Sequence, residues 1–153
     1  MRTDAVILKL PPPIWTLAYL LIAAGVSFLT GWRGAGLPLV PVAVALVVLG
    51  AALTVAAAVL FRKVGTELNP TSAVNRVLVT TGPFRFTRNP MYLGLVTVAL
   101  GVALWVGAYA MLLAPLATFA TVNFVHVPYE EAKMRRQFGE AFETYRRTVR
   151  RWI

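Results

Sequence analysis

A short polar stretch, GPFRFTRNPMYLG (82–94), stands directly before a long apolar run. Pro90 suits the first turn of a helix, and Asn89 before it is a typical capping residue. Free N–H groups at such a helix start, together with Arg85 and Arg88, favour an anion such as a carboxylate. Taken alone, the stretch also fits an ordinary capped helix whose arginines lie on the cytoplasmic side of a membrane.

A second polar group follows near the end of that apolar run. Asn123, His126 and Glu130 recur at i, i+3 and i+7, which places them on one face of a helix. Polar side chains at membrane depth usually face the bundle interior or a cavity. Glu130 and Glu131 are two of only six acidic residues in the chain. Their carboxylates are suited to accept hydrogen bonds from ribose hydroxyls or from an ammonium group. The alternative is that they only complement the dipole of a final helix.

Composition identifies the class of protein. The chain has 153 residues, is 58% hydrophobic and 14% charged, and has a mean hydropathy of +0.69. We therefore expect one all-α integral membrane domain over 1–153. The absence of cysteine excludes disulfides, and a single histidine argues against a metal centre. The net charge of +9 comes without a groove-reading motif, so we expect no nucleic-acid partner.

The apolar runs predict four membrane spans. Residues 91–127 are continuously apolar, and as one helix they would extend roughly 55 Å, nearly twice the bilayer core. A hairpin that turns near Gly107 is the natural solution, since glycine can take the reversed backbone. The expected spans are 14–32, 38–61, 91–106 and 108–127.

The basic residues predict the orientation. With four spans, 14 of the 15 lie on one side of the membrane, and only Arg33 lies opposite. With three spans, seven C-terminal charges would have to be translocated, against the usual bias. We therefore expect both termini and the loop 62–90 to be cytoplasmic.

The segment 128–150 is expected to form one amphipathic cytoplasmic helix. Such a helix either lies against the headgroups or folds over the mouth of the bundle. In the third span, Gly94 and Gly101 lie on one face and allow close approach of a neighbouring helix. The apolar face of the C-terminal segment consists of Met134, Phe138, Phe142, Tyr145, Val149 and Trp152.

Two sequence segments carry a family resemblance. LVTTGPFRFTRNPMYLG (78–94) and EEAKMRRQFGEAFETYRRTVRRW (130–152), with GTELNP (65–70) before them, resemble the isoprenylcysteine carboxyl methyltransferase family. They are also similar to the related phospholipid methyltransferases, including short bacterial members. The resemblance covers 61–153, and the paired motif is much more specific than either half.

The resemblance implies a multi-pass enzyme of a prokaryotic inner or cell membrane that transfers a methyl group from S-adenosylmethionine. Arg88 is expected to pair with the cofactor or an anionic acceptor, Tyr92 to contact the cofactor, and one glutamate to hold the ribose. Asn89 stands where the family has a histidine, which keeps a hydrogen-bonding side chain but removes a titratable one. Phe138, Gly139 and Tyr145 match a lid. The candidate catalytic residues are Arg88, Asn89 and Glu130, and the candidate cofactor-binding residues are Arg88, Asn89, Pro90, Tyr92, Leu93, Gly94, His126, Glu130 and Glu131.

The sequence does not identify the methyl acceptor. A lipid-like or small hydrophobic molecule is expected, either a prenylated cysteine carboxylate, a phospholipid amine or a thiol, so transfer to O, N or S is not distinguished. One alternative is an NADPH-dependent membrane reductase related to sterol reductases, although no Gly-x-Gly-x-x-Gly fingerprint is present. The other is a non-catalytic membrane module.

Overall fold

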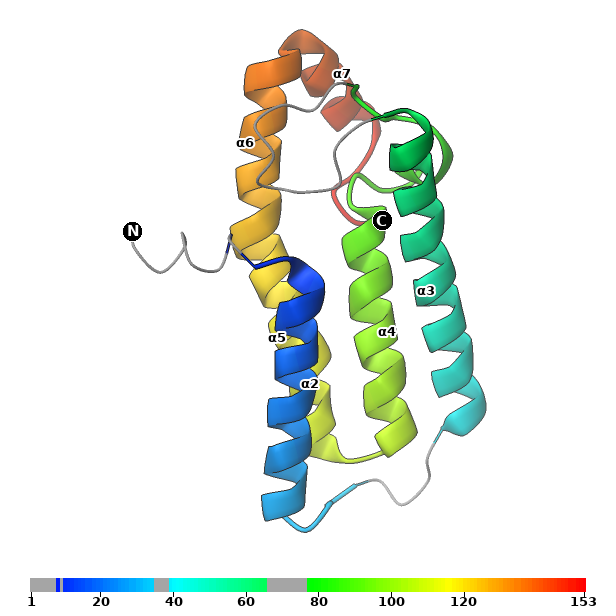
Figure 1. Cartoon of the computed structure of the whole chain (residues 1–153), viewed down its shortest axis with the longest axis vertical. Coiled ribbons are helices and arrows are strands. Elements are labelled where there is room, and N and C mark those ends of the chain that lie inside the picture. The colour runs from blue at the N-terminus through cyan, green and yellow to red at the C-terminus, as the bar shows by residue number, and fades with distance from the viewer. Residues whose placement is uncertain (1–7, 9, 35–38, 66–76) are drawn as a thin grey trace.

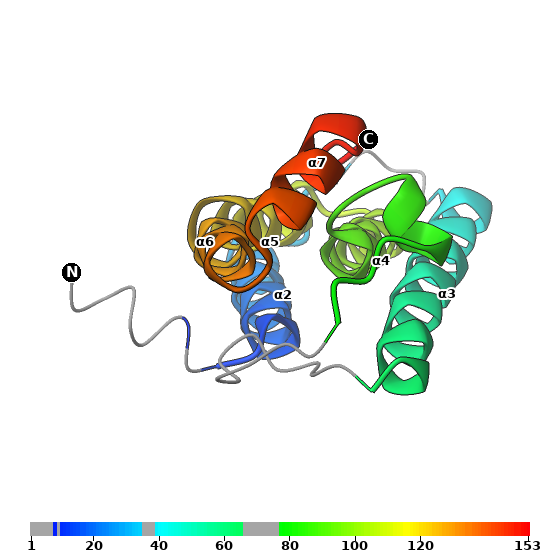
Figure 2. The same ribbon diagram turned by 90° about the horizontal axis from the view of Figure 1, so that it is seen from above.

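The structure, a computed structural model, describes residues 8, 10–34, 39–65 and 77–153, and the regular elements in these ranges are helices. Long helices lie side by side along the longest axis of the molecule (Figure 1). In chain order they are α2 (Pro12–Leu29), α3 (Val40–Lys63), α4 (Pro90–Val106) and a continuous helical rod over Tyr109–Phe138. Seen from above, α4 lies between α3 and the rod (Figure 2).

Three of these helices, α2, α3 and the rod, are long and apolar enough to cross a membrane within the described residues. α4 has 17 residues, so its role as a further span stays a prediction. The first two helices begin and end within two or three residues of the expected spans 14–32 and 38–61. Residues 66–76 lie outside the described residues. They include all of the GTELNP motif (65–70) except its first residue, and they form the middle of the loop 62–90.

The expected hairpin between α4 and the rod is present. Gly107 ends α4 with φ 72°, a left-handed backbone that glycine adopts without strain. The turn is fastened to the end of α2, because the Tyr109 N–H donates to the Arg33 carbonyl at 3.0 Å. Farther along the rod, the hydroxyls of Tyr19 and Thr121 lie 2.7 Å apart and join α2 to α5 (Leu113–Thr121).

α3 and α4 pack with almost no space between their backbones. A Cβ built on Gly94 would lie 2.5 Å from the Gly50 carbonyl oxygen, and one on Gly101 would lie 2.8 Å from the Ala43 carbonyl oxygen. Two glycines seven residues apart therefore form a seam against α3. This confirms the helix-packing interpretation of Gly94 and Gly101.

The segment 128–150 does not form one separate helix, so that expectation was wrong. The rod runs from η2 (Tyr109–Leu112) through α5 and a π-helical turn, η3 (Val122–His126), into α6 (Val127–Phe138) without a break at Pro128. The wider π turn makes room for the proline ring, which would clash in an α-helix. The break falls instead at Gly139, whose φ of 51° starts α7 (Glu140–Thr148).

α7 folds back over the end of the bundle, as Figures 1 and 2 show. Its apolar face does not point outward: Phe142 and Tyr145 are buried with Ala57 of α3 and with Val79 and Phe84. Of the two alternatives for the amphipathic segment, the structure therefore shows the fold over the bundle mouth. Burial of two aromatic side chains at this point holds the ends of α3, α4 and α6 together.

Candidate functional site

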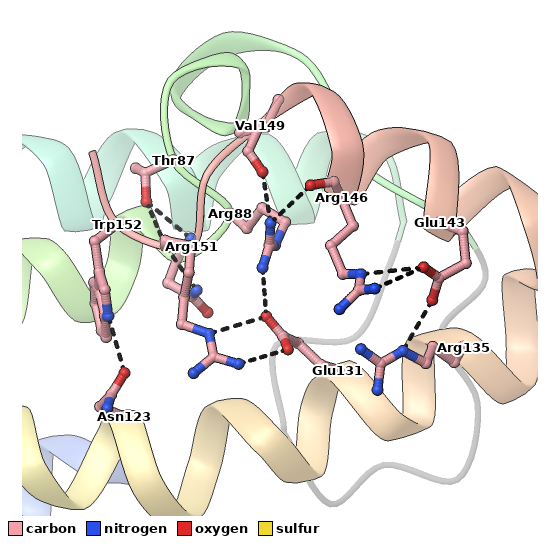
Figure 3. A network of polar contacts seen from close by, with 11 residues as sticks. Thr87, Arg88, Asn123, Glu131, Arg135, Glu143, Arg146, Val149, Arg151 and Trp152 are labelled. Carbon is pink, nitrogen blue, oxygen red and sulfur yellow. Dashed lines mark hydrogen bonds and ion pairs between the residues drawn. The ribbon is translucent and has the colours of Figure 1, made fainter.

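The stretch before α4 meets the glutamate pair of α6. The Arg88 guanidinium donates to Glu131 Oε1 at 2.8 Å, and the Tyr92 hydroxyl donates to Glu130 Oε1. Tyr92 lies in the first turn of α4, and Glu130 lies within the continuous rod just after the π-helical turn, so two segments that are distant in sequence form one polar junction. Figure 3 shows the Arg88–Glu131 side of it.

Glu131 is held by two arginines. Arg151 donates from Nε to Oε1 at 3.2 Å and from Nη2 to Oε2 at 2.8 Å, while Arg88 approaches Oε1 from the other side. The Glu131 side chain is only 9% exposed. Both carboxylate oxygens are thus satisfied by protein donors, which leaves Glu130 as the better candidate to contact a ligand.

Arg88 has further partners besides Glu131. Its Nη1 donates to the Val149 carbonyl at 2.5 Å and to the Arg146 carbonyl at 3.2 Å. Its side chain is 10% exposed. The structure therefore makes Arg88 a link between α4, α6 and the end of α7, while its Nε is buried without a hydrogen-bond partner among the described residues. Its expected pairing with the cofactor or an anionic acceptor stays a prediction.

Residues 149–152, here the C-terminal segment, run across the stretch before α4 (Figure 3). The Arg88 N–H donates to the Arg150 carbonyl at 3.0 Å, and the Thr87 hydroxyl donates to the Arg151 carbonyl at 3.0 Å. Trp152 donates from Nε1 to Asn123 Oδ1 at 3.0 Å and packs on Phe119, which fastens the segment to the rod. The sequence pattern did not indicate this contact.

Asn89 does not cap α4, contrary to expectation. Pro90 does stand in the first turn of the helix, but the Asn89 side chain makes no capping bond to α4. Its Nδ2 donates instead to the Arg151 carbonyl at 2.9 Å. The C-terminal segment competes for the amide because it runs directly past the helix start, and a sequence pattern cannot show such a neighbour.

A cavity of about 350 Å³ opens beside this junction. Its polar wall comes from the starts of α4 and α6, and its apolar wall from the end of α3, residues 77–79, α7 and the prolines that begin α2. The polar lining residues are Thr54, Arg88, Asn89, Tyr92, Glu130, Glu131, Lys133 and Tyr145, and the apolar ones include Ala58, Phe61, Phe84, Met91, Leu95, Met134 and Phe142.

Most of the residues expected from the sequence line this cavity. The structure brings together Arg88, Asn89, Pro90, Tyr92, Glu130 and Glu131. It does not place Leu93, Gly94 or His126 on the wall: Gly94 packs on α3, and His126 is fully buried with its ring 6.2 Å from that of Tyr92. Sequence reasoning missed Lys133 on the wall and Arg151 behind it. Lys133 follows Glu130 by three residues on the same helical face, a spacing that was available.

The Tyr145 hydroxyl holds α7 on the site by donating to the Phe84 carbonyl at 2.7 Å. Burial raises the pKa of Tyr145 to about 12, against an opposing effect of the Arg88 charge. Above the ordinary tyrosine pKa of 10, the unfolded chain therefore loses a proton that the folded chain keeps. We expect stability to be intact below that value and to fall as the pH rises toward 12. Tyr145→Phe should flatten this fall, measured as unfolding temperature against pH in detergent micelles, and an equally steep fall would contradict the assignment.

The comparisons with known proteins agree with this arrangement. The profile of the family described as "Phospholipid methyltransferase" matches residues 39–141, well over half of the chain. A protein of Haemophilus influenzae, described as uncharacterized, is 30% identical over 63 residues, which are 41% of this chain and all of that protein. No solved structure matches the chain. The family match covers α3, α4, the rod and the polar junction, so the resemblance of the paired motifs is confirmed and this chain belongs to the phospholipid methyltransferase family.

Proposed function

We propose that the chain is an S-adenosylmethionine-dependent membrane methyltransferase that acts on a lipid-like or small hydrophobic acceptor. The observation that carries this proposal is the cavity at the junction of α4 and α6. There, six residues expected from two separate motifs line one cavity together with apolar side chains of α3 and α7. The family supports methyl transfer in general, and the donor and acceptor are our inference.

The residues of the cavity suit the methyl donor. Its volume of about 350 Å³ lies at the low end of the ~300–1,000 Å³ typical of ligand pockets, which fits one nucleoside-sized molecule. S-adenosylmethionine, when bound, supplies a methyl carbon that already carries a sulfonium leaving group. Glu130 can accept from ribose hydroxyls or an ammonium, and Tyr92 orients that carboxylate. Positioning of this kind is worth up to roughly 7–11 kcal/mol, with little acid–base help needed.

The apolar wall suits the acceptor. Phe61, Met91 and Leu95 come from the parts of α3 and α4 nearest the polar junction, so a hydrocarbon chain lying against these side chains in the cavity would bring its polar end to Glu130. In this proposal the aromatic side chains beneath α7 exclude water from the reacting groups, which protects the transfer from competition. In this proposal α4 also crosses the membrane, which makes four spans in all. The cavity then faces the cytoplasm, and both termini lie on that side.

The test is methyl transfer by the purified chain. We expect wild type in lipid nanodiscs to bind S-adenosylhomocysteine and to transfer label from methyl-labelled donor to a component of the membrane extract. Glu130→Gln should reduce transfer about tenfold or more, because a charge-assisted bond is worth about 1.5–3 kcal/mol. The control is Glu140→Gln, whose side chain is 79% exposed on α7. No donor binding by wild type, or binding of NADPH in its place, would contradict the proposal.

A further inference from the structure

Arg151 contacts two residues of the cavity wall, although it is not among the described residues that line the cavity. Its backbone carbonyl accepts from Asn89 Nδ2 at 2.9 Å, and its guanidinium donates to both carboxylate oxygens of Glu131. Asn89 and Glu131 are buried, and both line the cavity. Because a side-chain amide is planar, the bond that fixes its nitrogen also fixes the direction of its oxygen. One residue of the C-terminal segment thus holds a polar group from before α4 and another from α6.

The C-terminal segment is itself anchored to the rod. Trp152 donates from Nε1 to Asn123 Oδ1 at 3.0 Å, and its ring centroid lies 5.1 Å from that of Phe119. Neither Trp152 nor Asn123 belongs to the described lining of the cavity. Asn123 is the first member of the polar stripe that the sequence places on one helical face with His126 and Glu130, and the proposed function gives it no role. Figure 3 shows its side-chain oxygen engaged with the C-terminal segment.

We propose that the C-terminal segment holds the polar wall of the cavity in its binding geometry, with Arg151 as the positioning residue and the Trp152–Asn123 bond as the anchor. Arg151 acts on the ligand only through Asn89 and Glu131. Side chains that are already held before a ligand arrives lose less conformational freedom on binding, so affinity rises without a new contact. This inference rests on the proposed function, which supplies the ligand, and it adds residues 149–152 to the site.

The experiment measures the Kd of S-adenosylhomocysteine by calorimetry for the full chain in lipid nanodiscs. Each titration is run well below the unfolding temperature of the variant, where a side chain that only stabilises the fold has no effect on the Kd. Arg151→Met removes the guanidinium and keeps the carbonyl, and Arg151→Lys keeps the charge. The control is Arg147→Met, which removes a charge from α7 whose side chain is 72% exposed.

Two further variants test the anchor. Trp152→Phe keeps an aromatic ring beside Phe119 and removes the N–H donor, while Asn123→Leu removes the acceptor at similar side-chain size. If both changes act through the one hydrogen bond, the double variant should lose no more affinity than either single variant.

We expect Arg151→Met to raise the Kd about tenfold, because its charge-assisted bonds to Glu131 are lost. Arg151→Lys should lie between Arg151→Met and wild type, and Arg147→Met should match wild type. Asn123→Leu and Trp152→Phe should each raise the Kd about threefold, the loss typical of one neutral hydrogen bond.

An unchanged Kd in Arg151→Met would overturn the positioning role of Arg151. An unchanged Kd in both anchor variants, or a fully additive loss in the double variant, would overturn the anchor. If Arg151→Met does not fold, Arg151→Lys decides the point, since a Kd equal to that of wild type would count against the inference. Failure of wild type to bind S-adenosylhomocysteine refutes the proposed function instead.

Discussion

Replacement of Glu131 by glutamine is expected to destabilise the folded chain by about 3 kcal/mol. The carboxylate balances Arg88 and Arg151, and its removal leaves a buried guanidinium without a counter-charge. Breaking a buried ion pair from one side typically costs about 3–5 kcal/mol. We take the lower end because the Arg151 side chain is 35% exposed and therefore partly solvated.

A double-mutant cycle tests this expectation. Arg88→Met alone should also destabilise, and the Glu131→Gln Arg88→Met pair should cost clearly less than the sum of the single changes. The free energy of unfolding is measured by denaturant titration in micelles, with Glu140→Gln as the exposed control. Strict additivity would show that the ion pair does not couple the two helices. Donor affinity, measured in parallel, should fall with Glu131→Gln, because the C-terminal segment and Arg88 are then no longer anchored to α6.

Gly94→Val is expected to be at least as damaging, with a loss of about 3 kcal/mol or failure to fold. A Cβ at this position would lie 2.5 Å from the Gly50 carbonyl oxygen and closer still to Thr54 Oγ1. Backbone atoms of α3 cannot move aside as the end of a flexible side chain can, so the two helices have to separate. The site suffers as well, since Thr54 and Met91, which line the cavity, come from these helices.

Gly25→Ala in α2 is the matched control for this change. Nothing lies within 4 Å of a Cβ built on Gly25, and its backbone has an ordinary negative φ. Alanine should therefore be neutral or stabilise the helix by about 0.5–1 kcal/mol. Unfolding measurements on both variants decide the point. A Gly94→Val chain as stable as Gly25→Ala would mean that the α3–α4 seam is not closely packed.

The helices were largely predictable because apolar length and glycine chemistry are local properties. The 37-residue apolar stretch required a turn, and Gly107 was the residue able to make it. The rod was not predictable past Pro128, since proline normally ends a helix. Here a π-helical turn just before it absorbs the ring, and π turns have no reliable sequence signature. The actual break depends on Gly139.

The site was predictable as a set of residues and not as a set of partners. The paired motifs indicated that Arg88, Tyr92, Glu130 and Glu131 belong together, and the cavity contains all four. Which arginine meets which carboxylate depends on tertiary contacts. Arg151 was one of seven basic residues in the C-terminal part of the chain, with nothing in its spacing to mark it. The sequence predicted that the Asn89 side chain caps α4, and it did not show that the Arg151 carbonyl would lie close enough to accept from the amide instead.

Glu130 and Glu131 are consecutive, so their side chains leave the axis of α6 about 100° apart. One reaches Tyr92, and the other reaches Arg88 and Arg151. The glutamate pair therefore joins α6 to its surroundings in two directions at one level of the helix. A ligand bound at Glu130 would lie one residue from the carboxylate that anchors Arg151 of the C-terminal segment.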